Sequence, residues 1–511
     1  MKMKVAAPID RRASGILLHP TSLPGPGIGT IGRDAARFVD WLADAGQSAW
    51  QILPLVAVDE GGSPYNGLSA FAANPLLIDL DLLVEDGLLE RVDPDPFSPS
   101  SPIDFPAVQR WKRQHLHRAF TAFREGAASG LAPELAEFRR RESAWLEDFA
   151  LFRVLRDRSG GAAWTRWDAD LRDRAPGALD RARTDLANLL DAEVFQQFLF
   201  ERQWRALREH ATRRGVAIIG DVPIFVAHDS ADVWTNRDLF ELDAAGHPTV
   251  VSGVPPDYFS ETGQRWGNPL YRWRAMARTG YAWWVERFRR TLDMVDLVRI
   301  DHFRGFESYW EVPAGEETAL NGRWLAGPGE AFFEVLADRL GPLPVIAEDL
   351  GLITQQVEEL RDALGFPGMR VLQFAFDGDP KNPHLPANYP ANSVAYTGTH
   401  DNDTVSGWWE AASEAERVRV GALIPGAGAE IHWALIRLVA DSGANLAIVP
   451  AQDLLGLGSG ARMNTPGTSA GNWSWRLRSM ALLDPEVLRR LRGLTGESGR
   501  LSSLPVLHDS L

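Results

Sequence analysis

The 511-residue chain contains 45% hydrophobic and 24% charged residues, a balance that is ordinary for a folded globular protein and excludes a largely disordered one. Its net charge of −15, from 53 basic and 68 acidic residues, makes nucleic acid and anionic membranes poor partners. The absence of cysteine excludes disulfides, thiolate metal sites and a cysteine nucleophile. A neutral substrate is the easiest class to accommodate.

The amino-terminal stretch MKMKVAAPIDRRASG (1–15) has two lysines but no apolar core of the length that a signal peptide needs. Nowhere do about 18 apolar residues follow one another, as a membrane-spanning helix would require. We therefore expect a cytoplasmic protein without a membrane segment, and the lack of cysteine fits a reducing compartment.

Short apolar runs that end in polar residues recur along the chain and predict buried parallel strands. These runs are 15–20, 49–55, 215–225, 294–301, 343–349, 369–376, 393–401 and 445–453. Helical spacing occurs between them at 33–46, 193–215 and 354–365, the last with Thr354 as a start signal and Gly365 as an end signal. Strands and helices that alternate in this way predict the α/β class and a (β/α)8 TIM barrel.

A simple barrel needs only about 250 residues, so insertions must hold the surplus. We expect one catalytic domain, 1–511, with a mainly helical insertion at 56–214 after the second strand. A second insertion after the third strand, 226–293, mixes turn and aromatic residues and would supply a loop at the substrate cleft. The connection 377–392 holds too many prolines for a full helix, and the about 60 residues after the eighth strand are too few for a β-sandwich.

Polar side chains collect where the predicted strands end, and the carboxyl ends of barrel strands face one shared cleft. These residues are His19, Asp221, Arg299, Asp301, Glu348, Asp349, His400, Asp401 and Asp453. The segment LVRIDHFRGF (297–306) shows the pattern, because an apolar strand passes directly into charged residues. The sequence therefore predicts an active site at this end of the barrel.

Arg299 and Asp301 are two residues apart on one strand, so their side chains point to the same face. A guanidinium there would lower the pKa of Asp301 and keep this carboxylate charged as a nucleophile. The alternative is a purely structural ion pair at a strand end.

Glu348 ends the next strand, and neighbouring strands lie about 4.8 Å apart. The carboxyl groups of Asp301 and Glu348 could then lie about 5–5.5 Å apart, the separation of nucleophile and acid/base in retaining glycoside chemistry. Burial and the neighbouring negative charge would raise the pKa of Glu348, as a general acid requires. Asp349 is expected to face away from the cleft and to serve the structure.

Asp401, within TGTHDND (397–403), would be a third carboxylate, with His400 beside it. Three acids without a lysine or a magnesium motif are costly to hold together unless the substrate develops positive charge, as an oxocarbenium-like transition state does. The alternative for Asp401 is a loop cap that binds its own backbone.

Aromatic residues point to the same kind of substrate. The chain has 19 tryptophans, and Tyr258, Phe259 and Trp266 lie in 253–271, a stretch too rich in proline and glycine to be a core helix. Flat apolar rings with polar edges suit the faces of sugars, although loop packing explains any single ring equally well.

Other site motifs are weaker. Gly27, Gly29 and Gly32 match the spacing of a dinucleotide-binding loop, but Pro24 and Pro26 remove backbone donors and the second strand does not end in an acid. The H-E-x-x-H zinc helix and the phosphate-binding P-loop are both absent from the sequence. We expect no metal site and no organic cofactor.

Three motifs in this order, RIDHFRG (299–305), AEDLG (347–351) and TGTHDND (397–403), resemble the 4-α-glucanotransferases known as amylomaltases or disproportionating enzymes, in glycoside hydrolase family 77. The segments 63–80, 219–226, 254–271 and 464–473 resemble further parts of this family. The resemblance covers nearly the whole chain.

The resemblance implies a retaining double displacement on α-1,4-glucans, with Asp301 as nucleophile, Glu348 as acid/base and Asp401 as transition-state stabiliser. It also implies a set of substrate-binding residues: Tyr65, Asp221, Tyr258, Phe259, Trp266, Asn268, Arg299, His302, His400 and Asn464. Among these, Tyr258, Phe259 and Trp266 would belong to a loop over the cleft.

The expected activity is transfer of a glucan segment to another glucan or to glucose, without a cofactor. Maltooligosaccharides and glucans derived from starch or glycogen would be the substrates. A hydrolase remains an alternative, because it differs only in whether water or a sugar hydroxyl attacks the intermediate. A glucan-binding protein without catalysis is a second alternative, and a nucleotide-binding enzyme is a third.

Overall fold

The computed structural model describes residues 9–99, 101–256, 260–424, 428 and 430–504. Eight parallel strands close into a barrel in the order β1-β12-β11-β10-β9-β6-β3-β2. They are β1 (Ala13–Leu17), β2 (Ala49–Gln51), β3 (Ala217–Pro223), β6 (Leu297–Asp301), β9 (Val345–Ala347), β10 (Gly368–Val371), β11 (Ser393–Tyr396) and β12 (Leu446–Pro450). Each apolar run predicted from the sequence contains residues of one of these strands, which confirms the (β/α)8 barrel.

The barrel strands are buried on both faces, which explains why their sequences are apolar rather than alternating. Alternate side chains such as Leu17, Ile219 and Leu297 join one apolar cluster, and the positions between them pack with the outer helices. Gly15 lies where β1 approaches β2, and a Cβ atom there would meet the Ala49 carbonyl oxygen at 2.3 Å. Glycine is therefore required for this strand pairing.

Helices outside the barrel connect most consecutive strands. They are α1 (Arg33–Asp44), α8 (Ala187–Arg213), α11 (Ala282–Met294), α12 (Glu330–Leu340), α13 (Gln355–Leu364) and α16 (Ile431–Asp441), and α18 (Pro485–Glu497) follows β12. The predicted end of α13 is correct, with Gly365 in the left-handed region at φ +78°, although Thr354 makes no side-chain capping hydrogen bond. The connection 377–392 forms no α-helix, as its prolines predicted.

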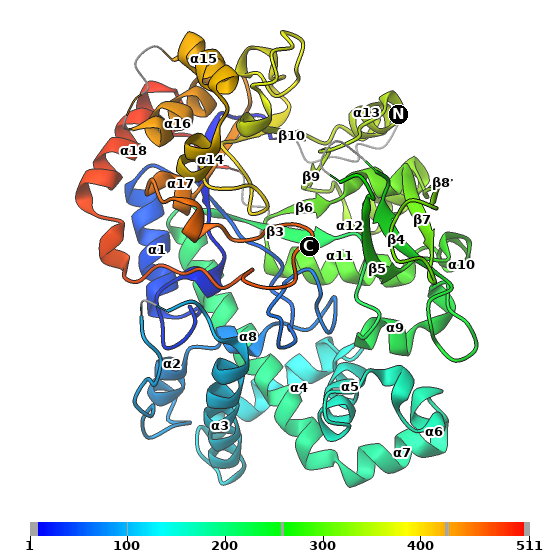
Figure 1. Cartoon of the computed structure of the whole chain (residues 1–511). Helices are drawn as coiled ribbons and strands as arrows, with labels where there is room; N and C mark the ends of the chain where they lie inside the picture. The colour runs from blue at the N-terminus through cyan, green and yellow to red at the C-terminus, as the bar shows by residue number, and fades with distance from the viewer. Residues whose placement is uncertain (1–8, 100, 257–259, 425–427, 429, 505–511) are drawn as a thin grey trace.

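Between β2 and α8 the chain forms a helical insertion (Figure 1). Its helices are α2 (Leu80–Glu85), α3 (Phe105–Arg124), α4 (Ala132–Arg141), α5 (Leu146–Arg158), α6 (Ala169–Arg172) and α7 (Pro176–Asp185). The long helix α8 contacts α3, α4, α5 and α7, and it also contacts α1 on the barrel. It therefore belongs to both parts of the molecule.

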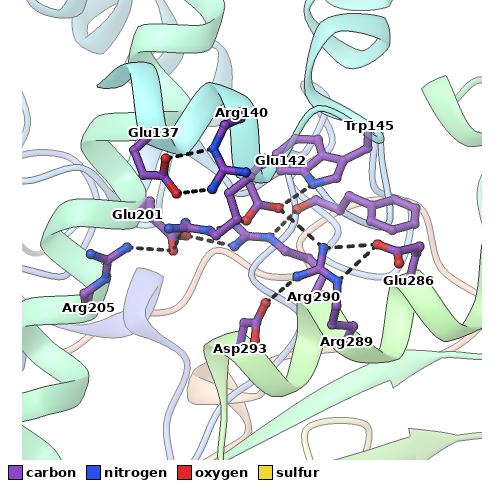
Figure 2. Close-up of polar contacts among 12 residues, drawn as sticks. Glu137, Arg140, Glu142, Trp145, Glu201, Arg205, Glu286, Arg289, Arg290 and Asp293 are labelled. Carbon is purple, nitrogen blue, oxygen red and sulfur yellow. Dashed lines mark hydrogen bonds and ion pairs between the residues drawn. The ribbon is translucent and has the colours of Figure 1, made fainter. Parts of the chain in front are cut away.

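Buried ion pairs join this insertion to α11 (Figure 2). Glu142, directly after α4, accepts hydrogen bonds from Arg141 and from the Trp145 indole, both at 2.8 Å. Glu201 of α8 pairs with Arg290 of α11 at 2.8 Å and with Arg141 at 3.0 Å. We call Arg141, Glu142, Glu201 and Arg290 the insertion network.

A second, antiparallel sheet in the order β5-β4-β7-β8 lies beside the barrel (Figure 1). It consists of β4 (Val250–Val254), β5 (Gln264–Pro269), β7 (Ser308–Pro313) and β8 (Arg323–Ala326). The sequence did not predict this sheet, because its central pair, β4 and β7, comes from two different barrel connections. Only part of the sheet lies in the predicted insertion 226–293, where α9 (Ala231–Thr235) and α10 (Trp273–Arg278) also lie.

The remaining helices are short. α14 (Val405–Ala411) and α15 (Glu414–Leu423) lie between β11 and β12, and α17 (Ala451–Leu454) follows β12 directly. The described residues after β12 form helices and loops, with no β-sandwich. Among the helices that the structure describes, none is long and apolar enough to cross a membrane.

Candidate active site

The carboxyl ends of β3, β6, β9 and β11 bring the predicted acids into one region. Asp221 of β3 pairs in register with Arg299 of β6, and Ile300 pairs with Ala347, the residue before Glu348. The prediction that β6 and the strand ending at Glu348 are neighbours is therefore correct. The separation of the Asp301 and Glu348 carboxyl groups remains a prediction of about 5–5.5 Å.

Arg299 bridges two carboxylates at the bottom of the site. Its Nη1 lies 2.6 Å from Asp221 Oδ2, and its Nη2 lies 3.0 Å from Asp301 Oδ1. The Tyr65 hydroxyl donates a hydrogen bond to the same Asp221 oxygen at 2.6 Å. Arg299 and Asp301 thus do point to one face, and Asp221 and Tyr65 complete a connected group.

Glu348 is fixed by backbone groups of the two strand ends. The amide of His302 donates to Glu348 Oε2 at 2.6 Å, and the amide of Leu350 donates to Oε1 at 2.9 Å. His302 can aim its amide this way because its backbone is left-handed, at φ +52°. The carboxyl group is therefore oriented before any substrate binds.

Burial raises the pKa of both central carboxyl groups, that of Asp301 to about 8. Arg299 opposes this effect on each of them, whereas Asp221, Glu348 and Asp401 add negative charge around Asp301. The prediction that Arg299 would leave Asp301 with a lowered pKa is therefore wrong, because desolvation outweighs the one guanidinium. The Asp301 side chain keeps 28% exposure to solvent, so a sugar that covers it would strengthen the desolvation.

Asp401 does not cap its own loop. Its Oδ1 accepts a hydrogen bond from the Asn464 side-chain amide at 2.6 Å and lies 3.4 Å from His400 Nε2. Arg462 donates to the Asp401 backbone carbonyl at 2.6 Å and to the Asn464 carbonyl at 2.7 Å. The side chain of Asp401 is 42% exposed, which leaves this carboxylate open to a ligand.

Three rings form a wall next to these acids. Tyr65 stacks on His400 with ring centroids 5.1 Å apart, and Trp473 lies 5.6 Å from Tyr65 and 6.0 Å from His400. Burial lowers the pKa of His400, so its imidazole is neutral at pH 7. Sequence reasoning missed Trp473 and Arg462, although Trp473 ends the motif segment 464–473.

Trp266 of β5 is 38% exposed, and its ring meets the His302 ring edge to face at 4.8 Å. Burial, together with the charge of Arg304, lowers the pKa of His302 to about 3. The Asn268 side chain donates to the Val226 carbonyl at 3.0 Å, so it holds β5 in place. The predicted residues Tyr258 and Phe259 lie outside the described residues.

Asp349 faces away from the cleft, as predicted, where it pairs with Arg361 and Arg370 and accepts a hydrogen bond from the Met369 amide. Asp453 is likewise buried and accepts hydrogen bonds from Thr397 and from the Val405 amide. Both are structural. Among the described residues, no group of three or more His, Asp or Glu is placed to hold a metal ion, and independence from cofactors remains a prediction.

A family model described as 4-alpha-glucanotransferase matches residues 18–482. A 4-alpha-glucanotransferase of Thermus thermophilus is 50% identical over 499 residues, which cover 96% of this chain and 99% of that protein. The 4-alpha-glucanotransferase of Synechocystis sp. is 51% identical over 93% of this chain and 96% of its own length. The solved structure of an amylomaltase from Streptococcus agalactiae in complex with acarbose is 37% identical, with a TM-score of 0.92, over 96% of this chain and 100% of that one.

Proposed function

The chain belongs to the 4-alpha-glucanotransferase family and has its glucan-transferring activity, and from this premise we propose that Asp301, Glu348 and Asp401 perform the transfer as a retaining double displacement. The observation that carries this assignment is the pair of carboxyl groups on neighbouring strand ends, both with a raised pKa. Such a pair can hold one proton between its members, as a nucleophile and a general acid must.

In the first step an Asp301 oxygen attacks the anomeric carbon of the donor sugar. The bond from that carbon to the glycosidic oxygen breaks, and Glu348 gives its proton to this oxygen as the shorter glucan leaves. The product is a glucosyl ester of Asp301. Because burial raises the pKa of Asp301 to about 8, this carboxyl group must lose its proton before it can attack, and the Arg299 guanidinium at 3.0 Å favours the ionised form.

In the second step Glu348 takes the proton from a hydroxyl group of the acceptor sugar. The acceptor oxygen attacks the anomeric carbon, and Asp301 leaves as a carboxylate, so the α configuration is retained. Asp401 would stabilise the positive charge that develops on the sugar in both steps, since its carboxylate is exposed and held by Asn464.

We assign the sugar next to the broken bond to Tyr65, Asp221, Arg299 and His400, which surround the nucleophile. Trp266, next to His302, offers an apolar ring face to a further sugar. The substrates would be maltooligosaccharides and glucans derived from starch or glycogen, with glucose as one acceptor. These are neutral molecules, in keeping with a site where four carboxyl groups outnumber the two arginines, Arg299 and Arg462.

Incubation with pure maltotriose tests the activity. A transferase releases glucose together with longer oligomers, whereas a hydrolase yields glucose and maltose with no longer product. No turnover of maltotriose or of longer maltooligosaccharides would favour a glucan-binding protein without catalysis. Activity should also survive treatment with EDTA, which tests the prediction that no metal is needed.

An α-glucosyl fluoride separates the roles of the two acids, because fluoride leaves with little help from an acid. Glu348→Gln should be slow on maltotriose yet form its covalent intermediate readily from the fluoride. Asp301→Asn should gain nothing from it. The trapped glucosyl group should be found by mass spectrometry on the peptide that carries Asp301, and a label on Glu348 or Asp401 would refute the assignment.

We also propose that the enzyme works in the cytoplasm. A chain without cysteine needs no oxidising compartment to fold, which supports this proposal. Fractionation of the source cells, followed by detection of the protein, tests it directly.

A further inference from the structure

Arg304 lies in the short 3-10 turn Phe303–Phe306, directly after the strand that carries Asp301. It is buried, with 6% of its surface exposed. Its guanidinium carbon sits 3.8 Å from the centroid of the Trp324 ring, which comes from β8 of the second sheet. Its Nη1 donates a hydrogen bond to the backbone carbonyl of Leu352. Arg304 thus connects the turn after β6, the second sheet and the loop after β9.

Among the described residues no carboxylate lies within ion-pair distance of Arg304, although the charge of Glu307 acts on it, and its Nε is buried without a hydrogen-bond partner. A buried guanidinium without a paired carboxylate is costly to keep, and methionine would fill much of the same space at lower cost. The stacking on Trp324 and the bond to Leu352 are the contacts that can compensate. Both contacts fix the direction of the guanidinium.

The bond to Leu352 is the last of four hydrogen bonds that join residues 300–304, at the end of β6 and after it, to residues 348–352 after β9. The Glu348 amide donates to the Ile300 carbonyl at 3.0 Å, and the Phe303 amide donates to the Glu348 carbonyl at 3.1 Å. The His302 amide donates to the Glu348 carboxylate at 2.6 Å. We call this row of hydrogen bonds, between the segments that carry Asp301 and Glu348, the seam. The bond from Arg304 to Leu352 is the one farthest from the barrel strands.

The Leu352 carbonyl that Arg304 holds lies in a loop whose first residue, Asp349, is fixed by ion pairs with Arg361 and Arg370. Leu352 is 53% exposed, and Gly351 before it adopts φ +82°. The Leu350 amide of the same loop donates to Glu348 Oε1 at 2.9 Å. A shift of the loop would therefore move one of the two donors that orient the carboxyl group of Glu348.

We infer that Arg304 is a positioning residue for Glu348: clamped on Trp324, it holds Leu352 so that the Leu350 amide keeps the general acid aimed at the glycosidic oxygen. This inference rests on the proposed role of Glu348. The contacts of Arg304 go to Leu352 and Trp324 and not to Asp301. Loss of Arg304 should slow cleavage of a glycosidic bond, which needs the proton of Glu348. It should spare the release of fluoride, which does not.

The test compares maltotriose with α-maltosyl fluoride in the Arg304→Met enzyme. The kcat for maltotriose should fall by about 10–100-fold with little change in KM, because a misplacement of about 1 Å can cost that much. The first-turnover burst of fluoride release should stay within about 3-fold of the parent, because fluoride needs little acid help. Arg323→Met is the matched control and should change neither rate. Arg323 lies on β8 next to Trp324, but its side chain is 73% exposed.

Two further variants protect the test against a simple folding defect. Arg304→Lys keeps the charge but loses the flat stacking surface, and Trp324→Leu removes the surface on which the guanidinium rests. Both should show the same selective loss on maltotriose. A defect that only lowers the folded fraction would reduce both substrates equally, and that result in all three variants would overturn the inference.

Glu348→Gln serves as the reference that separates the two proposals. If its fluoride burst is also lost, the role proposed for Glu348 is wrong. If Glu348→Gln is rescued by the fluoride and the Arg304 variants are not, the role of Glu348 stands and the inference about Arg304 fails.

Discussion

Two buried groups of arginine and carboxylate occupy different parts of the molecule, and they differ in their balance of charge. At the cleft, the carboxyl groups of Asp221, Asp301, Glu348 and Asp401 surround the single guanidinium of Arg299. In the insertion network, Glu142 and Glu201 are both buried and together have Arg141, Arg205 and Arg290 as partners (Figure 2). At the cleft the carboxyl groups outnumber Arg299, whereas Glu142 and Glu201 of the insertion network have three arginine partners between them.

The pKa values follow this balance. Desolvation pushes the pKa of Glu142, Glu201, Asp301 and Glu348 upward, but in the insertion network Arg290 and Arg141 outweigh it, and the pKa of both Glu142 and Glu201 is lowered. At the cleft desolvation wins, and the pKa of both Asp301 and Glu348 is raised. Burial alone therefore does not mark a catalytic acid. A raised pKa marks a candidate catalytic acid only where the carboxyl group also lies at the cleft, since the buried Asp453, whose pKa is raised to about 6, is structural.

The largest difference between the two groups should appear when the nucleophile is removed. Asp301→Asn should lower transfer from maltotriose by about 10⁴-fold or more, because no other group can form the glucosyl ester. The melting temperature should not fall, since the variant relieves an excess of negative charge. Product analysis and thermal unfolding measure the two effects. Residual activity above about 1% would point to a different nucleophile.

Removal of an acid from the insertion network should lower stability and leave activity unchanged. Glu201→Gln leaves Arg290 buried without its ion pair, which should lower the free energy of unfolding by about 3–5 kcal/mol while kcat per folded molecule is unchanged. Glu137→Gln is the matched control, because Glu137 pairs with Arg140 at the surface, where solvent screens the pair, and the loss should be much smaller. Urea unfolding and maltotriose kinetics test both, and equal losses in the two variants would contradict the comparison.

Arginine-to-lysine changes probe the cation of each group. An ammonium group cannot bridge Asp221 and Asp301 as the Arg299 fork does, so Arg299→Lys should lower kcat by about 100-fold. Arg290→Lys should lower stability instead and leave kcat within about 2-fold. Steady-state kinetics on maltotriose distinguish the two, and an equal loss of kcat in both variants would mean that the groups do not differ in function.

The smallest effect concerns how stability changes with pH. The contribution of Asp301 to stability should fall as the pH rises, whereas that of Glu201 should increase. The pKa of Asp301 is raised, so the native state holds more protons than the unfolded state between about pH 4 and 8, and the excess charge costs stability as the pH rises through this window. Asp301→Asn should therefore be more stable than the parent at pH 8, by about 1 kcal/mol or more, with no difference near pH 3.

The pKa of Glu201 is lowered, so its contribution is present above about pH 4.3 and is lost as the pH falls through the lower native pKa. The defect of Glu201→Gln should accordingly be full at pH 7 and shrink below about pH 4. Unfolding in urea across this pH range gives both curves. Parallel curves for the two variants would show that the sign of the pKa shifts is not the property that separates the groups.

The sequence by itself determined the barrel and the end of it at which the predicted acids collect. Strands buried on both faces must be apolar throughout, so eight short apolar runs were sufficient to locate the eight strands of the barrel. Because parallel strands expose their carboxyl ends to one cleft, the acids that follow those runs, Asp301, Glu348 and Asp401, could be grouped before their positions were known. The motifs around them then indicated the family.

Only the tertiary structure decided the features that depend on distant partners. The second sheet pairs β4 with β7 across two barrel connections, and the insertion network joins three helices, so neither leaves a periodic pattern in the chain. The contact of Arg304 with Trp324 is of the same kind. The pKa of Asp301 was predicted with the wrong sign for a related reason: the sequence shows that Arg299 is near, but desolvation depends on everything that covers the carboxyl group in space.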